Sequence, residues 1–241
     1  MIRALYSSAA SMMAQQQNMD IISNNIANIN TAGYKKVRAT FQDALYSAIE
    51  IRGGDQQANL QVGNGSRLAA TQRDFKQGGL QQTDRLLDFA IDGPGFFTIL
   101  RQDGSICYTR DGSFRLSSEF EGGVAVNRIV TAQGEYVLDR DGLPIQVDDY
   151  DMLPYLFGIV DFANPEGLEA IGNNQFVGTE ASGPPVYLDF YNVKQGFLET
   201  SNVDMAEEMT QMILAQRVYQ LSSRVLQAAD EMEHIANNLR R

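Results

Sequence analysis

The stretch from Asp139 to Asp151, "DRDGLPIQVDDYD", is rich in the side chains most able to do chemistry. Closely spaced carboxylates can bind Ca²⁺ or act as the acid and base of glycan cleavage. The stretch lacks the D-x-[DN]-x-[DN]-G spacing and the closing glutamate of a calcium loop. No apolar pocket is evident around Asp148, Asp149 and Asp151 that would make one of them a general acid. We therefore interpret these residues as solvated turn acids.

Other candidates for chemistry are isolated. His234 and Cys107 are the single histidine and cysteine, so neither His-ligated zinc nor an intramolecular disulfide is expected. We interpret His234 as an exposed helix residue and Cys107 as a small core residue. "GNGSRL" (63–68) lacks the third glycine of a dinucleotide fingerprint, and "GPGFF" (93–97) places proline where a phosphate loop needs a backbone donor. The sequence predicts no catalytic residue, metal site or cofactor, and hence a protein that is not an enzyme.

The elements that would position such residues differ between the ends and the middle of the chain. Residues 1–30 and 203–241 contain neither Gly nor Pro, so all 21 glycines lie between them. Asp-Gly pairs that begin at Asp103, Asp111 and Asp141 predict type I′ hairpin turns. Short apolar runs between such turns predict antiparallel strands at 86–91, 96–100, 106–109, 135–138, 144–147 and 155–162.

The N-terminal segment has the spacing of a long helix. Apolar residues recur every three or four positions, and Gly33 stands where a left-handed terminating residue is expected. The end of the helix is crowded with Asn24, Asn25 and Asn28, although asparagine is a poor helix former. The expected face comprises Ile2, Leu5, Ala9, Met12, Gln16, Met19, Ile22 (or Ser23), Ile26 and Ile29.

The C-terminal segment predicts a coiled-coil helix. A capping signal precedes it, because Ser201, Asp204 and Glu207 are spaced three apart. Its apolar residues then alternate steps of four and three, which is the a/d seam of a coiled coil. The seam comprises Leu214, Val218, Leu221, Val225, Ala228, Met232, Ile235 and Leu239.

A second apolar stripe lies further around the same helix. A helix that is apolar on two sides is normally buried on two sides. The N-terminal helix can cover one side, whereas the other needs either a second copy of the chain or the middle domain. The second stripe comprises Met205, Met209, Met212, Tyr219 and Leu226.

Together these patterns predict an α+β fold, in which long N- and C-terminal helices pair as a coiled coil around a mainly antiparallel β middle domain. The net charge of −11 disfavours a nucleic-acid partner. No run approaches the ~18 apolar residues of a membrane span, and the N-terminus lacks the apolar core of a cleavable signal. We expect an N-terminal helix at 1–34, an extended linker or hairpin at 35–80 (with a glycine-rich loop at 52–66), a β domain at 81–197 and a C-terminal helix at 198–241.

Four stretches carry a family resemblance. "NNIANINTAGYKK" (24–36) resembles the N-terminal signature of the bacterial flagellar axial proteins, which are rod, hook and hook-associated subunits. "LDFAIDGPGFFTI" (87–99) and "YTRDGSF" (108–114) resemble its middle block, and "GFLETSNVDMAEEMTQMILAQRVYQ" (196–220) its C-terminal signature. The opening residues and the 45–80 segment are most similar to the distal rod subunit. A hook subunit would have a larger middle insertion and proximal rod subunits would lack the full β domain, but the other distal rod subunit and a hook-like subunit stay open as alternatives.

The resemblance implies a structural role in the flagellar basal body. Such subunits polymerise into a hollow helical drive shaft, whose inner wall is the terminal helices and whose outer wall is the β domain. It implies export through the flagellar type III apparatus without a cleaved signal peptide, and a place outside the cytoplasm, in the periplasm or cell wall. The expected partners are copies of itself, adjoining rod and hook subunits, and the bushing rings of the outer envelope where those exist. A wall-binding or wall-degrading protein is the distant alternative.

The resemblance also assigns roles to residues. One apolar face of the last helix would contact the internal partner helix, and the other face would contact the next subunit. The residues of both stripes are therefore assigned to interfaces. Asn24, Asn25 and Asn28 would make hydrogen bonds between helices or subunits that fix their register, unless they form an exposed polar face. The polar lumen would be lined by Gln15, Gln17, Asn18, Gln211 and Gln227.

Overall fold

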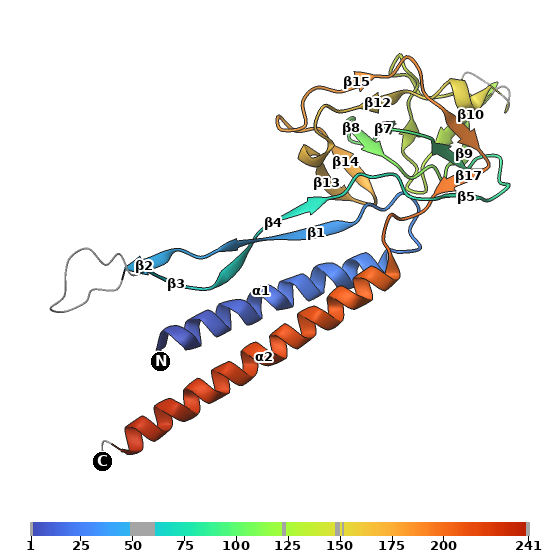
Figure 1. The fold of residues 1–241 in the computed structure, drawn as a ribbon. Helices are drawn as coiled ribbons and strands as arrows, with labels where there is room; N and C mark the ends of the chain where they lie inside the picture. Colours follow the sequence, from blue (N-terminus) through green and yellow to red (C-terminus); the bar gives the residue numbers. More distant parts are fainter. Residues whose placement is uncertain (1, 49–60, 122–123, 148–149, 151, 240–241) are drawn as a thin grey trace. The chain divides into compact units, whose positions relative to one another are not determined.

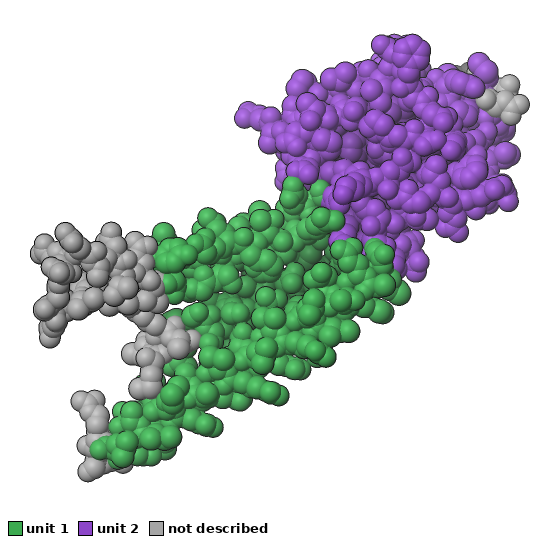
Figure 2. Space-filling model, in the orientation of Figure 1, with its two compact units in different colours: residues 1–27, 37–73, 204–241 green, residues 28–36, 74–203 purple. Residues whose placement is uncertain are grey.

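A computed structural model describes residues 2–48, 61–121, 124–147, 150 and 152–239. It divides into two compact units, each assembled from distant parts of the chain (Figure 2). Unit 1 comprises residues 1–27, 37–73 and 204–241. Unit 2 comprises residues 28–36 and 74–203.

Unit 1 contains two long helices, α1 (Ile2–Ala27) and α2 (Met205–Asn238), which run side by side (Figure 1). The α1 helix also packs against a long β-hairpin. The predicted α+β class, with paired terminal helices and an antiparallel middle, is therefore confirmed. The helix α1 ends at Ala27, earlier than predicted, and residues 28–34 of the predicted helical segment belong to unit 2.

The hairpin of unit 1 is antiparallel. Strand β1 (Val37–Asp43) pairs with β4 (Ser66–Arg73), with a register shift between Thr40 and Phe41. Strand β2 (Tyr46–Ala48) pairs with β3 (Gln61–Gly63). The glycine-rich loop predicted at 52–66 lies largely outside the described residues, which resume at β3.

Unit 2 is built on a nine-stranded sheet whose described pairings are all antiparallel. The main order is β13-β14-β8-β7-β11-β10-β9, and β12 joins β15 to β7. Two further sheets of unit 2 have two strands each: β6 pairs with β16, and β5 pairs with β17. The elements are β5 (Leu80–Gln82), β6 (Phe89–Ile91), β7 (Phe96–Leu100), β8 (Ile106–Thr109), β9 (Arg115–Glu121), β10 (Val124–Val130), β11 (Tyr136–Val137), the 3₁₀ turns η1 (Leu153–Tyr155) and η2 (Pro165–Gly167), β12 (Ile159–Asp161), β13 (Glu169–Gly172), β14 (Gln175–Val177), β15 (Val186–Tyr187), β16 (Val193–Gln195) and β17 (Phe197–Glu199).

Strand β7, in the middle of the unit 2 sheet, is buried on both of its faces. Successive residues of a strand point to opposite faces, so Phe96 and Phe97 of β7 enter different cores. Phe97 packs edge-to-face on Phe114 and Phe157 in the larger core. Phe96 packs against Phe176 in the smaller one. Strand β7 therefore contributes to both hydrophobic cores of unit 2.

The predicted strands at 96–100 and 106–109 coincide with β7 and β8. The segment 144–147 makes isolated bridges instead of a strand, and 155–162 combines the end of η1 with β12.

The Asp-Gly turns differ from the predicted type. In type I′ both central residues need a positive φ, but here only Gly104 and Gly142 have one, while Asp103 and Asp141 do not. The bonds Gly104 N to Arg101 O and Arg101 N to Ser105 O fit a type I turn followed by a glycine bulge. The two-residue turn with both φ angles positive is Asn173-Asn174, between β13 and β14.

Candidate functional site

The α2 helix presents two different faces within unit 1. Its buried and half-buried positions repeat every three or four residues, which is the period of one helical face. Two of these positions contact α1 directly, since Ser222 Oγ lies 3.2 Å from Ser11 Oγ and Glu208 binds Asn25. This inner face mixes small and large side chains and comprises Glu208, Met212, Ala215, Tyr219, Ser222, Leu226, Ala229, Glu233 and Ala236.

The predicted coiled-coil seam is a different face and is exposed. At about 100° per residue it is centred roughly 120° around α2 from the inner face. Its large side chains range from 40% exposed for Val218 to 83% for Leu239. The sequence left open which face of α2 meets the N-terminal helix; within unit 1 the inner face makes that contact and the seam stays exposed. We call the outward residues Leu214, Val218, Leu221, Val225, Ala228, Met232, Ile235 and Leu239 the outer stripe.

The second predicted stripe is divided between these environments. Met212, Tyr219 and Leu226 are half-buried on the inner face. Met205 and Met209, in the first turns of α2, are exposed. The stripe therefore does not act as one surface within a single chain.

Asn25 forms the polar centre of unit 1. Its side chain is 1% exposed, and its Nδ2 donates to Val37 O at 2.8 Å and to Glu208 Oε2 at 3.0 Å. In return, Val37 N donates to Asn25 Oδ1 at 3.0 Å. One asparagine thus joins α1, the start of β1 and the first turns of α2, which fixes the register of three elements.

The other predicted residues of the N-terminal segment lie in varied environments. Ile22 is buried and Asn24 is exposed. Asn28 lies beyond the end of α1, where its Oδ1 accepts a hydrogen bond from Thr31 Oγ1 at 3.2 Å. Leu5, Met12, Met19 and Ile26 of the predicted apolar face of α1 are half-buried.

The predicted helix-end residues have separate roles. Asp204 is the N-cap of α2, and its Oδ1 accepts from Ala206 N at 2.8 Å and Glu207 N at 3.2 Å. Ser201 is buried in unit 2, and its Oγ accepts from Val203 N. Gly33 does not terminate α1. It has a φ of +67°, and a Cβ there would lie 2.6 Å from the Arg110 carbonyl carbon.

An ionic cluster that the sequence reasoning missed lies inside unit 2. Lys35 Nζ is 2.6 Å from Glu199 Oε1, and each of the two residues is 1% exposed. Arg110 Nη1 lies 3.3 Å from Glu199 Oε2, and its guanidinium lies over the Phe96 ring. Burial lowers the pKa of Lys35, against the opposing pull of Glu199. Both residues lie inside stretches that carry the family resemblance, Lys35 in 24–36 and Glu199 in 196–220, but nothing in the sequence signals that they pair.

The residues considered for chemistry lie apart. Cys107 is buried in β8, where burial raises the pKa of its thiol. His234 is exposed on α2, with Nδ1 3.1 Å from Asn238 Nδ2. Asp148, Asp149 and Asp151 lie outside the described residues. Across the part of the chain that is described, no group of three or more His, Cys, Asp or Glu side chains is placed to hold a metal ion.

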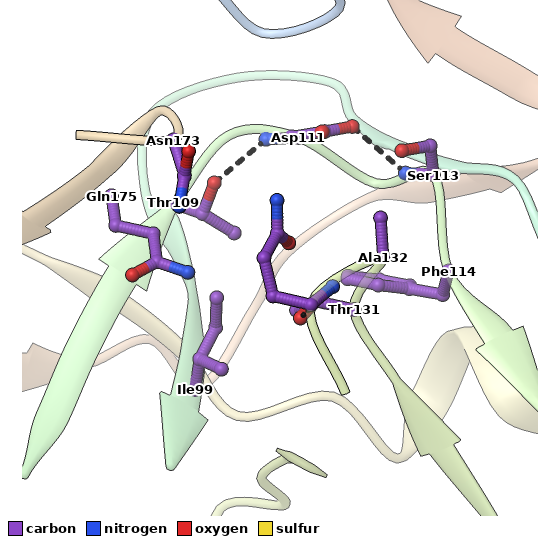
Figure 3. Close-up of a pocket in the computed structure, with 10 residues that line it drawn as sticks. Ile99, Thr109, Asp111, Ser113, Phe114, Thr131, Ala132, Asn173 and Gln175 are labelled. Atoms are coloured by element: carbon purple, nitrogen blue, oxygen red, sulfur yellow. Dashed lines mark hydrogen bonds between the residues drawn. The ribbon is translucent and has the colours of Figure 1, made fainter. Parts of the chain in front are cut away.

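A small polar pocket lies at the edge of the unit 2 sheet (Figure 3). Its volume of about 10 Å³ holds about one water molecule. Thr109 Oγ1 accepts from Asp111 N at 3.1 Å, and Asp111 Oδ1 accepts from Ser113 N at 3.0 Å. These side chains stabilise the loop after β8. A shallower hollow of about 540 Å³, lined by Ile106, Tyr108 and Pro184 among others, contains a single carboxylate, that of Glu180.

None of the helices in the described ranges is long and apolar enough to cross a membrane.

Comparison with known proteins adds to this geometry. Three family profiles match the chain in order. Residues 5–35 match "Flagella basal body rod protein", 90–161 match "Flagellar hook protein FlgE/F/G D1 domain", and 194–239 match "Flagellar basal body rod FlgEFG protein C-terminal". The first and last of these segments contain Lys35 and Glu199, respectively.

Whole-length relatives agree with the profiles. The flagellar basal-body rod protein FlgG of Borreliella burgdorferi is 41% identical over 271 aligned positions, which cover 100% of both chains. FlgG of Agrobacterium fabrum is 37% identical, with 98% of each chain covered. The flagellar hook-basal body complex protein FlhP of Bacillus subtilis is 28% identical, with 100% of each covered. The chain belongs to the family of flagellar basal-body rod proteins of the FlgG type.

Proposed function

We propose that the protein is a structural subunit of the flagellar distal rod, and that copies of it polymerise through the outer stripe of α2. The observation that carries this proposal is the exposure of that stripe. The outer stripe is a heptad repeat of mainly large apolar side chains that the rest of the chain leaves exposed. A stripe of this kind is normally buried against another helix. Family membership points to the same role.

The outer stripe is large enough to drive assembly. Complete burial of a Leu, Val, Ile or Met side chain contributes about 1.5–3 kcal/mol. Most of these side chains are about half exposed, so covering each contributes about 1 kcal/mol. The stripe as a whole therefore offers several kcal/mol per subunit contact, before the entropy cost of association.

In this function the paired helices form the wall of a hollow shaft, and unit 2 lies outside it. The polar residues Gln15, Gln17, Asn18, Gln211 and Gln227 line the lumen through which export substrates pass. The shaft passes torque to the adjoining rod and hook subunits and turns within the envelope rings. The protein itself reaches this place through the flagellar export apparatus, with its N-terminus uncleaved, and it performs no catalysis.

Assembly of purified protein tests the proposal. Leu221→Asp places a charge in the outer stripe, where polymer formation would bury it, and should abolish sedimentable polymer. Gln220→Asp is the matched control, because Gln220 is exposed on another side of the same turn. Cys107, the single cysteine, reports whether unit 2 stays folded in each variant, since a buried thiol resists alkylation.

Electron microscopy of the polymer distinguishes the branches of the family. Straight tubes support the distal rod assignment, whereas curved tubes indicate a hook-like subunit. Normal tubes from the Leu221→Asp variant would contradict the role of the outer stripe.

A further inference from the structure

The two chain segments that lead into the helices of unit 1 meet inside unit 2. Lys35 follows the end of α1, and Glu199 precedes the start of α2. Their side chains form the buried ion pair of 2.6 Å, although they are separated by 164 positions in the sequence. This ion pair therefore connects the segment that follows α1 with the segment that precedes α2.

Glu199 is bound from several directions. Besides Lys35, its carboxylate accepts from Arg110 Nη1 at 3.3 Å and from Gly78 N at 2.8 Å. Its backbone carbonyl accepts from Gly33 N at 2.8 Å. Lys35 and Arg110 are thus the two cationic side chains that offset the charge of this buried carboxylate, and Glu199 is the carboxylate that pairs with the Lys35 ammonium.

Residues 28–36 contain turns and irregular backbone but no helix or strand. Long-range contacts to the rest of unit 2 therefore order them. Asn174 Nδ2 donates to Ala32 O at 2.9 Å, and Lys36 N donates to Asn202 Oδ1 at 2.7 Å. Lys35 Nζ also donates to Lys76 O at 2.8 Å. Among these contacts, only the one to Glu199 offers a buried ammonium an opposite charge.

A buried ammonium without its carboxylate is strongly unfavourable, because the desolvation cost is not offset. Docking of residues 28–36 and burial of Lys35 therefore take place together. We propose that Lys35, Glu199 and Arg110 form a latch that seats residues 28–36 in unit 2 of a single free chain. The latch joins residues 28–36, which follow α1, to the segment around Glu199, which precedes α2, before any second copy binds. It goes beyond the proposed function, which concerns contacts between copies.

Hydrogen exchange of the full-length, unpolymerised protein tests the latch. The amides of Gly33 and Lys36 report docking, because both donate within unit 2. Alkylation of Cys107 reports unfolding of unit 2 as a whole. In the wild-type protein, Gly33 and Lys36 should be protected in the absence of polymer.

Lys35→Met removes the charge and keeps the length of the side chain. Breaking one partner of a buried pair should speed exchange at Gly33 and Lys36 on the order of a hundredfold, with Cys107 still protected. Lys76→Met is the matched control. Its ammonium is 80% exposed beside Asp74, so exchange should change by no more than about twofold. Glu199→Gln should also release Gly33 and Lys36.

Two outcomes would overturn the latch. Unchanged protection of Gly33 in Lys35→Met would mean that the ion pair does not hold the segment. Loss of Cys107 protection in the same variant would mean that the cluster supports the whole of unit 2 rather than a local docking step. No readout involves a second copy, so a wild-type protein that fails to polymerise would contradict the proposed function and leave the latch untouched.

Discussion

Replacement of Asn25 by alanine should uncouple the three elements that this side chain joins in unit 1. Asn25→Ala removes both donations from Nδ2 and the acceptor for Val37 N. Alanine fits a helix sterically, so the change acts through lost hydrogen bonds rather than through a distorted α1. Three groups lose a partner: the backbone O and N of Val37, and Oε2 of Glu208, a residue that is 2% exposed.

The magnitude follows from these bonds. A lost bond to a neutral backbone group costs about 1 kcal/mol, and one to a charged group about 1.5–3 kcal/mol. Alanine returns about 0.5 kcal/mol through its better helix propensity. The free energy of unfolding of unit 1 should therefore fall by about 3 kcal/mol.

Ellipticity at 222 nm is a suitable assay, because both α-helices of the described chain belong to unit 1. Urea titration of the unpolymerised protein should show a lower midpoint for the helical signal. Alkylation of Cys107 in unit 2 should keep its wild-type midpoint.

Gln17→Ala is the control for α1, because Gln17 is an exposed residue of the same helix. It should change stability by less than about 0.5 kcal/mol. A shift of that small size for Asn25→Ala would refute the reasoning, since it would mean that the buried hydrogen bonds contribute nothing net.

Two further predictions concern unit 2. Gly33→Ala should destabilise it by about 2 kcal/mol more than Gly104→Ala in urea titrations followed by Cys107 alkylation. Both glycines have a positive φ, but an added Cβ would clash with the backbone of Arg110 at Gly33, whereas it would meet open space at Gly104. Equal effects of the two substitutions would show that the close approach of Gly33 to the Arg110 backbone does not affect stability. A hydrogen bond from Tyr136 and, next, one from Arg128 lower the pKa of Glu119. The lowered pKa contributes stability above pH 4.5, and this contribution is lost as pH falls through the folded-state pKa. Glu119→Gln should therefore flatten the acid side of a plot of the free energy of unfolding against pH. An unchanged plot would contradict this prediction.

Local pattern predicted the strands that are buried on both faces. The apolar runs of β7 and β8 carry their own signal, because most of their side chains are buried, although Ile106 at the start of β8 is exposed. Turn type was harder to predict. Asp-Gly suits both a type I′ turn and a type I turn with a bulge, and register across the hairpin decides between them. At Asn173-Asn174, asparagine takes the positive φ angles that we expected of Asp-Gly pairs.

Long-range pairing was beyond the sequence. Nothing in the spacing of Lys35 and Glu199 indicates that they meet, because the intervening residues form most of unit 2. Periodicity likewise identified two apolar stripes on α2 but could not assign either to α1. The assignment depends on side-chain contacts between α1 and α2, such as Asn25–Glu208 and Ser11–Ser222, which only the folded chain brings together.

The division of α2 into an inner face and an exposed outer stripe bears on assembly. On the inner face, Met212, Tyr219 and Leu226 supply more apolar area than Ala215, Ser222 and Ala229. The internal helix pair therefore covers the inner face but leaves the apolar area of the outer stripe exposed. Under the proposed function, the hydrophobic free energy of covering the outer stripe is released only when another copy binds, so a subunit could stay single at low concentration and still form a polymer.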